Sequence, residues 1–163
     1  MTAEQVATPP ALATRGLEVS FRGRGTSGLA RAVDGVDLEL GRGEILALVG
    51  ESGCGKTTLA RTILGLQSST AGEVRMDGAV LGTSSRERKA YRRRVQLVLQ
   101  DPTGALNPRH TVYEAVAEGL RIHGMVEAEE KRVAQALSLA GLRPPERFFL
   151  RYPHELSGGQ RQR

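Results

Sequence analysis

The sequence predicts an α/β fold with three parts: an antiparallel β part, an α/β core around a glycine-rich loop, and a helical block. Alternating apolar residues indicate antiparallel strands at 13–43 and 73–82. A short apolar run, the glycine-rich loop and a helical pattern follow one another at 44–66. With a further apolar run at 95–100, these residues form the expected core. Residues 1–12 read as a disordered tail and 101–163 as the helical block.

The β part is predicted from alternation and turn chemistry. Leu17, Val19 and Phe21 alternate with polar residues, and a second strand is expected up to Leu40, with a break at Gly35. Residues 73–81 predict a hairpin, because an Asp-Gly pair at 77–78 lies between apolar residues.

The core is predicted to contain two short parallel strands, at 44–49 and 95–99, because both runs are almost wholly apolar. Between them, 56–66 predicts a helix with Leu59, Ile63 and Leu66 on one face, and 86–94 predicts a short charged helix.

Two amphipathic helices are expected in the helical block. Thr111 and Glu114 form a capping box that opens the first, with Val112, Val116 and Leu120 facing inward. The second covers 127–140, with Val133, Leu137 and Ala140 as its apolar stripe. It ends at Gly141, and the Pro144-Pro145 pair prevents its continuation.

Composition narrows the function classes. The chain has 163 residues, 39% hydrophobic and 25% charged, which are values of a globular protein. No apolar run approaches the roughly 18 residues that span a bilayer. The single cysteine excludes an intrachain disulfide and fits a reducing compartment. The net charge of +5 is compatible with nucleic acid or an anionic membrane, but the positive charge is spread over 86–94 and 143–163 and aromatic residues make up only 4% of the chain, so we expect no nucleic-acid binding.

The glycine-rich loop has the pattern of a phosphate-binding loop, Gly-x4-Gly-Lys-Thr, between an apolar run and a helix. Its glycines allow backbone N–H groups to turn inward, and the helix N-terminus favours phosphate oxygens. The lysine places a charge on the β- and γ-phosphates, and the threonine hydroxyl is suited to Mg²⁺. The residues expected to contact nucleotide are Gly50, Glu51, Ser52, Gly53, Cys54, Gly55, Lys56, Thr57 and Thr58. We interpret the cysteine as a small residue tolerated in the loop.

A second helix start with exposed amides is expected at Ser157-Gly158-Gly159-Gln160, where the serine can cap the helix. In this order the two motifs resemble an ATP-binding cassette (ABC) ATPase, with 156–160 as its signature motif. The stretches 100–112 and 151–163 are similar to oligopeptide and dipeptide importer ATPases. The resemblance implies a P-loop NTPase with an N-terminal antiparallel β subdomain, an incomplete RecA-like core and a helical subdomain.

The same resemblance implies a site for ATP and Mg²⁺. Lys56 and Gln100 take the catalytic roles, and Thr57 and Gln100 contact the metal. Phe21 stands where the family has an aromatic residue that stacks on adenine, although a core or edge phenylalanine is an equal alternative. The signature residues Ser157, Gly158, Gly159 and Gln160 close over nucleotide held by the other subunit.

The implied function is that of the ATP-binding subunit of an importer, carrying peptide or another solute. Its partners are integral membrane permeases, a second ATPase subunit in a homo- or heterodimer, and indirectly a solute-binding protein. It is expected at the cytoplasmic face of the cell membrane, as a peripheral protein. The chain ends at Arg163, before the acidic residues such an enzyme uses for hydrolysis, so we expect background turnover from this chain alone. The alternatives are a non-hydrolysing nucleotide-binding fragment or pseudogene product, and a cytosolic family member without a permease.

Overall fold

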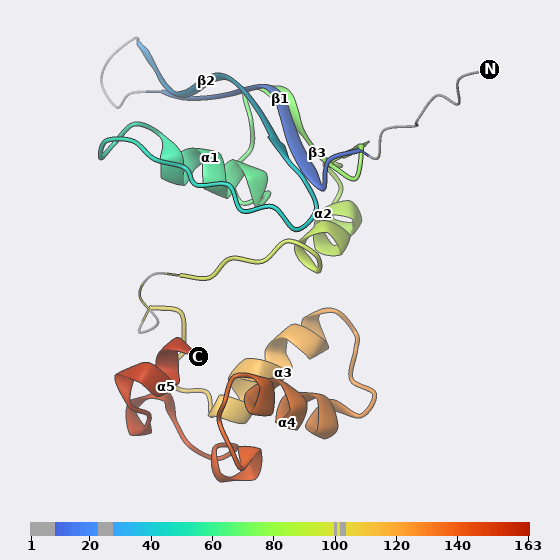
Figure 1. The fold of residues 1–163 in the computed structure, drawn as a ribbon, viewed down its shortest axis with the longest axis vertical. Coiled ribbons are helices and arrows are strands. Elements are labelled where there is room, and N and C mark those ends of the chain that lie inside the picture. Colours follow the sequence, from blue (N-terminus) through green and yellow to red (C-terminus); the bar gives the residue numbers. More distant parts are fainter. Residues whose placement is uncertain (1–8, 23–27, 100, 102–103) are drawn as a thin grey trace, which may run out of the picture. The chain divides into compact units, whose positions relative to one another are not determined.

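The computed structural model describes residues 9–22, 28–99, 101 and 104–163. The chain divides into two compact units, residues 1–96 and 97–163, each with its own apolar core. Figure 1 shows a sheet with helices beside it in the first unit and a group of helices in the second. The predicted helical block at 101–163 falls within the second unit. A division of the first unit into a β subdomain and a core stays a prediction.

The first unit contains a four-stranded antiparallel sheet in the order β2-β1-β3-β4. The strands are β1 (Leu12–Arg22), β2 (Leu29–Leu40), β3 (Ala71–Met76) and β4 (Ala79–Val80). The alternation at Leu17 and Val19 is confirmed, because both side chains are buried. β2 continues through Gly35, where φ is +64° and the pairing with β1 is irregular. The predicted break is therefore a bulge within one strand.

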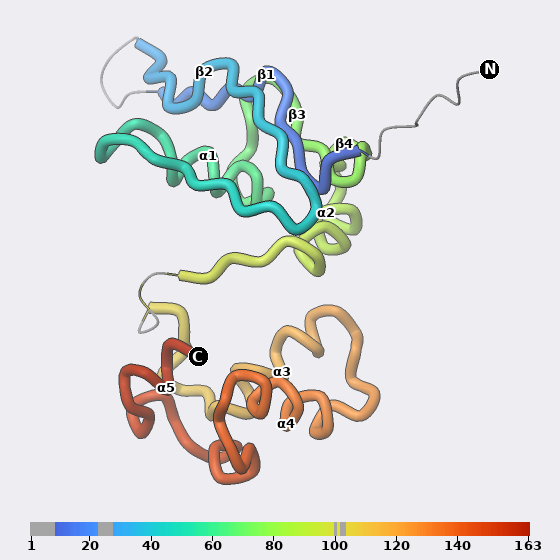
Figure 2. The backbone as a smooth tube through the Cα atoms, in the orientation of Figure 1, coloured from blue at the N-terminus to red at the C-terminus, as the bar shows by residue number. Residues whose placement is uncertain are grey.

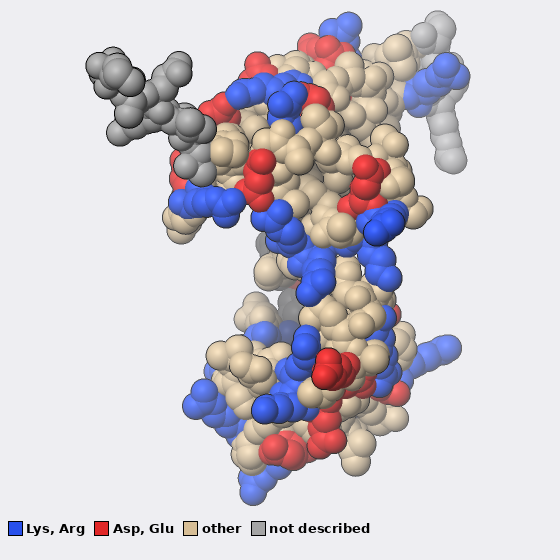
Figure 3. Space-filling view, turned by 90° about the vertical axis from the view of Figure 1, so that its right-hand side faces the viewer, with Lys and Arg blue, Asp and Glu red and all other residues tan. Residues whose placement is uncertain are grey.

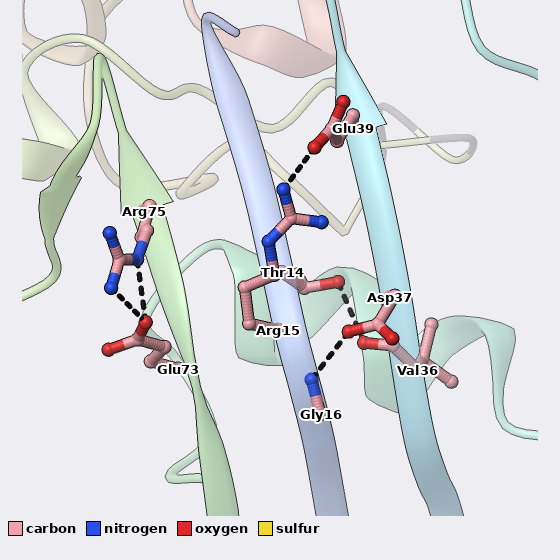
Figure 4. A network of polar contacts seen from close by, with 8 residues as sticks. All are labelled: Thr14, Arg15, Gly16, Val36, Asp37, Glu39, Glu73 and Arg75. Atoms are coloured by element: carbon pink, nitrogen blue, oxygen red, sulfur yellow. Dashed lines mark hydrogen bonds and ion pairs between the residues drawn. The ribbon is translucent and has the colours of Figure 1, made fainter. Parts of the chain in front are cut away.

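Polar contacts hold the central strand β1 against β2 (Figure 4). The buried Thr14 hydroxyl donates to the Val36 carbonyl at 2.9 Å, and the Gly16 amide donates to the Asp37 carboxylate at 2.7 Å. Arg15 pairs with Glu39 across the same two strands. The buried hydroxyl needs this acceptor, because an unpaired polar group inside a protein is costly.

The predicted hairpin is confirmed between β3 and β4. Its two turn residues, Asp77 and Gly78, have φ values of +50° and +81°, as a two-residue hairpin turn requires. The Asp77 carboxylate then pairs with Arg42 and Arg94, both at 2.5 Å, and the Arg94 guanidinium in particular holds the pKa of Asp77 below its usual value. This carboxylate therefore ties the hairpin to residues that follow β2 and the second helix.

The two helices of the first unit are α1 (Lys56–Ile63) and α2 (Ser85–Arg92). Leu59 of α1 and Tyr91 of α2 are buried in one cluster with Leu17, Val19, Val33 and Val74. α1 is shorter than predicted, because Gly65 has φ of +64° and ends it, which leaves Leu66 outside the helix and 56% exposed. α2 opens on a capping box between Ser84 and Glu87.

Both predicted parallel strands are wrong for the described residues. Residues 44–49 and 95–99 form no strand and follow extended traces in Figure 2. Ile45, Val49 and Val98 are 95%, 88% and 91% exposed. A parallel strand exists only through hydrogen bonds to its neighbours, and the sheet order above includes neither segment.

The second unit contains α3 (Val112–Ile122), α4 (Glu129–Leu139), two short 3-10 helices (Pro145–Arg147 and Pro153–Glu155) and α5 (Gly158–Gln162). The predicted capping box is confirmed, because Thr111 accepts from the Glu114 amide at 3.2 Å and Glu114 accepts from the Thr111 amide at 2.7 Å. Five of the six residues predicted to face inward are confirmed: Val112, Val133 and Leu137 are buried in the core of this unit, and Val116 and Leu120 pack against it. The core also contains Ala117, Leu142, Phe148 and Leu156, whereas Ala140 is not part of it.

Candidate functional site

The phosphate-binding loop lies directly before α1, and its last glycine is packed against β2. Gly55 has φ of +96°, and a Cβ atom built on it would lie 2.0 Å from the Ala32 carbonyl oxygen. Any other residue would overlap with this backbone oxygen and would also be strained in the left-handed region. The structure thus explains why glycine stands at this position of the motif.

Lys56 folds back over the loop. Its Nζ donates to the Gly50 carbonyl at 2.8 Å and to the Glu51 carbonyl at 2.6 Å, and it lies 3.5 Å from the Cys54 sulfur. These contacts gather residues 50, 51 and 54 around one ammonium group. The positive charge is therefore held where the loop closes, next to the first turn of α1.

The first turn of α1 offers free donors. In the part of the chain that the structure describes, the amides of Lys56, Thr57 and Thr58 have no acceptor, and the first intrahelical bond runs from Leu59 to Gly55. Thr57 is exposed, so its hydroxyl is accessible to solvent. Three amides, an ammonium and a hydroxyl at one helix start form a set suited to a polyanion.

The residues of the loop are thus brought together as the motif predicts. Gly53 has φ of +84°, and Glu51, Ser52 and Cys54 are exposed around the same turn. The Ala32 carbonyl is a contact that the sequence did not predict. It is 23 positions away from Gly55, and no local pattern marks it.

Phe21 lies near the end of β1 and is 42% exposed. It pairs with Ala30 of β2, two positions before the Ala32 that contacts Gly55. Phe21 therefore belongs to the pair of strands, β1 and β2, against which the phosphate-binding loop packs. The exposed ring is available for stacking, and the contact with adenine stays a prediction.

Of the two residues predicted to contact a metal, Thr57 is among the described residues. Gln100 lies outside the described residues. Among the residues that are described, no group of three or more His, Cys, Asp or Glu side chains could hold a metal ion. Thr57 offers one hydroxyl, so a cation here would depend on phosphate oxygens for most of its ligands.

The signature motif starts α5 as predicted. Ser157 accepts from the Gln160 amide at 3.2 Å, and Gln160 accepts from the Ser157 amide at 3.0 Å. Leu156 is buried and fixes this start to the core of the second unit, whereas Ser157, Gly158 and Gly159 are exposed. A surface of exposed backbone results, and its contact with nucleotide on another subunit stays a prediction. No helix in the described ranges has the length and apolar character to cross a membrane.

Comparisons with known proteins agree with these motifs. Residues 33–163 match the family model of the ABC transporter. The chain is 43% identical to a putative peptide import ATP-binding protein of Brucella ovis, over 94% of this chain and 48% of that protein. It is 45% identical to the di/tripeptide transport ATP-binding protein DppF of Pseudomonas aeruginosa, over 92% of this chain and 47% of that protein. The chain thus spans about half the length of these relatives.

Solved structures confirm the fold class. The dimeric post-hydrolysis state of the ATP-binding cassette MJ0796, bound to ADP and Pi, superposes with a TM-score of 0.74 at 28% identity. The match covers 92% of this chain and 65% of that one. The phosphate-binding loop, the signature motif, the family model and the shared fold together show that this chain belongs to the ABC transporter family.

Proposed function

We propose that the chain is the nucleotide-binding part of an ATP-hydrolysing importer subunit, which binds Mg-ATP at the loop before α1. The observation that carries the proposal is the set of donors there: three free amides and the Lys56 ammonium around one helix start. Such a set of N–H donors and one positive charge stabilises the negative charge of phosphate oxygens. The relatives named for peptide import support peptide as the cargo class.

Lys56 has a defined part in this proposal. Its ammonium now bonds to two loop carbonyls, and β- and γ-phosphate oxygens would replace them as acceptors. The Thr57 hydroxyl would contribute one ligand to Mg²⁺, whose chemistry is to neutralise charge on the phosphates. We also propose that Gln100 contacts the metal and the attacking water, and that Phe21 stacks on adenine.

The test is nucleotide binding by the whole chain, measured with a fluorescent ATP analogue in the presence of Mg²⁺. Lys56→Ala removes the side-chain charge that bonds to the loop and should weaken binding by about tenfold or more, since a charge-assisted hydrogen bond is worth roughly 1.5–3 kcal/mol. Lys131→Ala removes an exposed lysine of α4 and should leave binding unchanged. Equal binding by both variants would refute the assignment of the loop.

We infer partners and location from the same family. The proposed partners are integral membrane permeases and a second ATPase subunit, and the proposed place is the cytoplasmic face of the membrane. A dimer is the state named for the MJ0796 cassette structure, which supports the second subunit. Co-purification with a permease encoded beside this chain would support the importer assignment, and a chain that never co-purifies with one would favour a cytosolic family member.

A further inference from the structure

The net charge of the chain is concentrated in one short segment. Residues 85–94 contain six Lys or Arg and one Glu, a net charge of +5. The whole chain has 23 basic and 18 acidic residues, so 17 of each remain elsewhere and cancel. The segment that contains α2 and the turn after it therefore carries by itself a net charge equal to that of the whole chain.

The helix separates an inner face from a charged outer one. Tyr91 is buried, and its hydroxyl donates to the Ile63 carbonyl at 2.5 Å. At 100° per residue, Arg86, Lys89 and Arg93 lie opposite Tyr91, and all three are exposed. We call these three residues the basic stripe.

Of the other charged residues in this segment, three have partners, and the fourth, Arg88, is only partly exposed. Arg92 donates to the Gly65 carbonyl at 2.7 Å, and Arg94 pairs with Asp77 at 2.5 Å. Glu87, the one acid of the helix, accepts from Ser84 in the capping box. Within the described residues, the three side chains of the basic stripe have no acidic partner. Their positive charge therefore faces solvent, and no acidic side chain of the described residues neutralises it.

Figure 3 shows the surface on which this charge appears. Lys and Arg side chains gather at the level of α2 on the face turned toward the viewer. The stripe contains no aromatic or aliphatic side chain that could insert between bases or acyl chains. Its attraction for a partner is thus purely electrostatic and must weaken with salt.

We propose that the basic stripe is a docking surface for an anionic lipid bilayer. Basic residues beside a membrane bind acidic headgroups with about 1 kcal/mol each, and the stripe supplies three of the six basic residues in this segment. The choice of a membrane over nucleic acid rests on the proposed importer function, which places the chain beside a bilayer. The stripe would then hold the first unit at the lipid surface independently of contacts with a permease.

The test is co-sedimentation of the full chain with vesicles. Binding is expected to vesicles that contain phosphatidylglycerol, to be absent with phosphatidylcholine alone, and to be lost near 1 M salt, where screening acts within about 3 Å. The triple variant Arg86→Gln/Lys89→Gln/Arg93→Gln should lower the partition coefficient by on the order of 100-fold, since each basic residue contributes about fivefold.

A matched control removes the same charge elsewhere. Lys131→Gln/Arg132→Gln/Arg147→Gln changes three exposed basic residues of the second unit and should cost at most roughly a few-fold. Equal losses from both triple variants, or vesicle binding without anionic lipid, would overturn the proposal. Tighter binding to duplex DNA than to the vesicles would assign the stripe to nucleic acid instead.

Failure of this proposal can be separated from failure of the proposed function. The fluorescent ATP analogue reports on the loop before α1, and the basic-stripe variant should bind it as the parent does. If vesicle binding is absent while nucleotide still binds, the stripe proposal alone is wrong. If vesicles bind in a stripe-dependent way but nucleotide does not, the nucleotide assignment is wrong.

Discussion

Gly55→Ala should destabilise the first unit by more than backbone strain alone. The residue has φ of +96°, which costs an L-amino acid about 1–2 kcal/mol. The new Cβ would also lie 2.0 Å from the Ala32 carbonyl oxygen. That oxygen is part of the β2 backbone and cannot rotate away, so the overlap adds about 1–3 kcal/mol, as overpacking usually does. The expected total is about 2–5 kcal/mol.

Gly53→Ala is the matched comparison in the same loop. Its φ is +84°, but a Cβ atom there would have no neighbour within 4 Å. This variant should therefore lose only the strain energy, about 1–2 kcal/mol. The difference between the two variants isolates the contact between Gly55 and Ala32.

Urea unfolding followed by far-ultraviolet circular dichroism gives the two free energies, because the chain has no tryptophan to serve as a fluorescence probe. With a slope of about 1–3 kcal/mol per molar urea, a clash of about 2 kcal/mol separates the midpoints by roughly 1 M. Hydrogen exchange at α1 identifies the transition of the first unit. Coincident midpoints for the two variants would refute the packing of the loop against β2.

Three further predictions concern hydrogen bonds. Tyr91→Phe should cost about 1 kcal/mol in urea unfolding. Burial raises the pKa of Tyr91 to about 12, so stability present below pH 10 should fall as the pH rises toward 12, and the ultraviolet titration of the parent should show a late ionisation that Tyr91→Phe lacks. Thr111→Ala should cost the second unit about 1 kcal/mol, and Thr111→Ser much less. Hydrogen bonds from Thr111 lower the pKa of Glu114, so the ionised carboxylate stabilises the fold, and this stabilisation should be lost as the pH falls through that pKa. Over the same acid range, Thr111→Ala should lose less stability than the parent does. Asp77→Asn should melt at a lower temperature than the parent at pH 7. The two melting temperatures should converge as the pH falls through the lowered pKa of Asp77. A difference in melting temperature that does not change with pH would contradict the role of the Arg94 pair.

Features set by neighbouring residues were predictable from the sequence. The Asp77-Gly78 turn and the capping box at Thr111 depend on contacts within four positions, and both were found as predicted. The capping box at Ser84 was equally visible as Ser-x-x-Glu but was not predicted. The loop residues were also recognised, because the spacing of glycine, lysine and threonine is itself local.

Features that depend on distant residues were not predictable in this way. The apolar runs at 44–49 and 95–99 have the composition of buried parallel strands, but a strand forms only if neighbours pair with it. The overlap of Gly55 with the Ala32 carbonyl joins two elements far apart in the sequence. The neighbours that a strand pairs with, and contacts between distant residues, leave no periodic pattern in the sequence. They are therefore seen only in the folded backbone.

The short helix α1 connects two surfaces of the first unit. Its N-terminus presents the loop donors, and at and just after its other end Tyr91 and Arg92 donate to the Ile63 and Gly65 carbonyls. Its eight residues span about 12 Å. If nucleotide shifts α1, the free energy of that shift reaches α2, and thermodynamic linkage requires the effect to be reciprocal. A factor by which ATP changes the partition onto lipid would then equal the factor by which lipid changes the affinity for ATP.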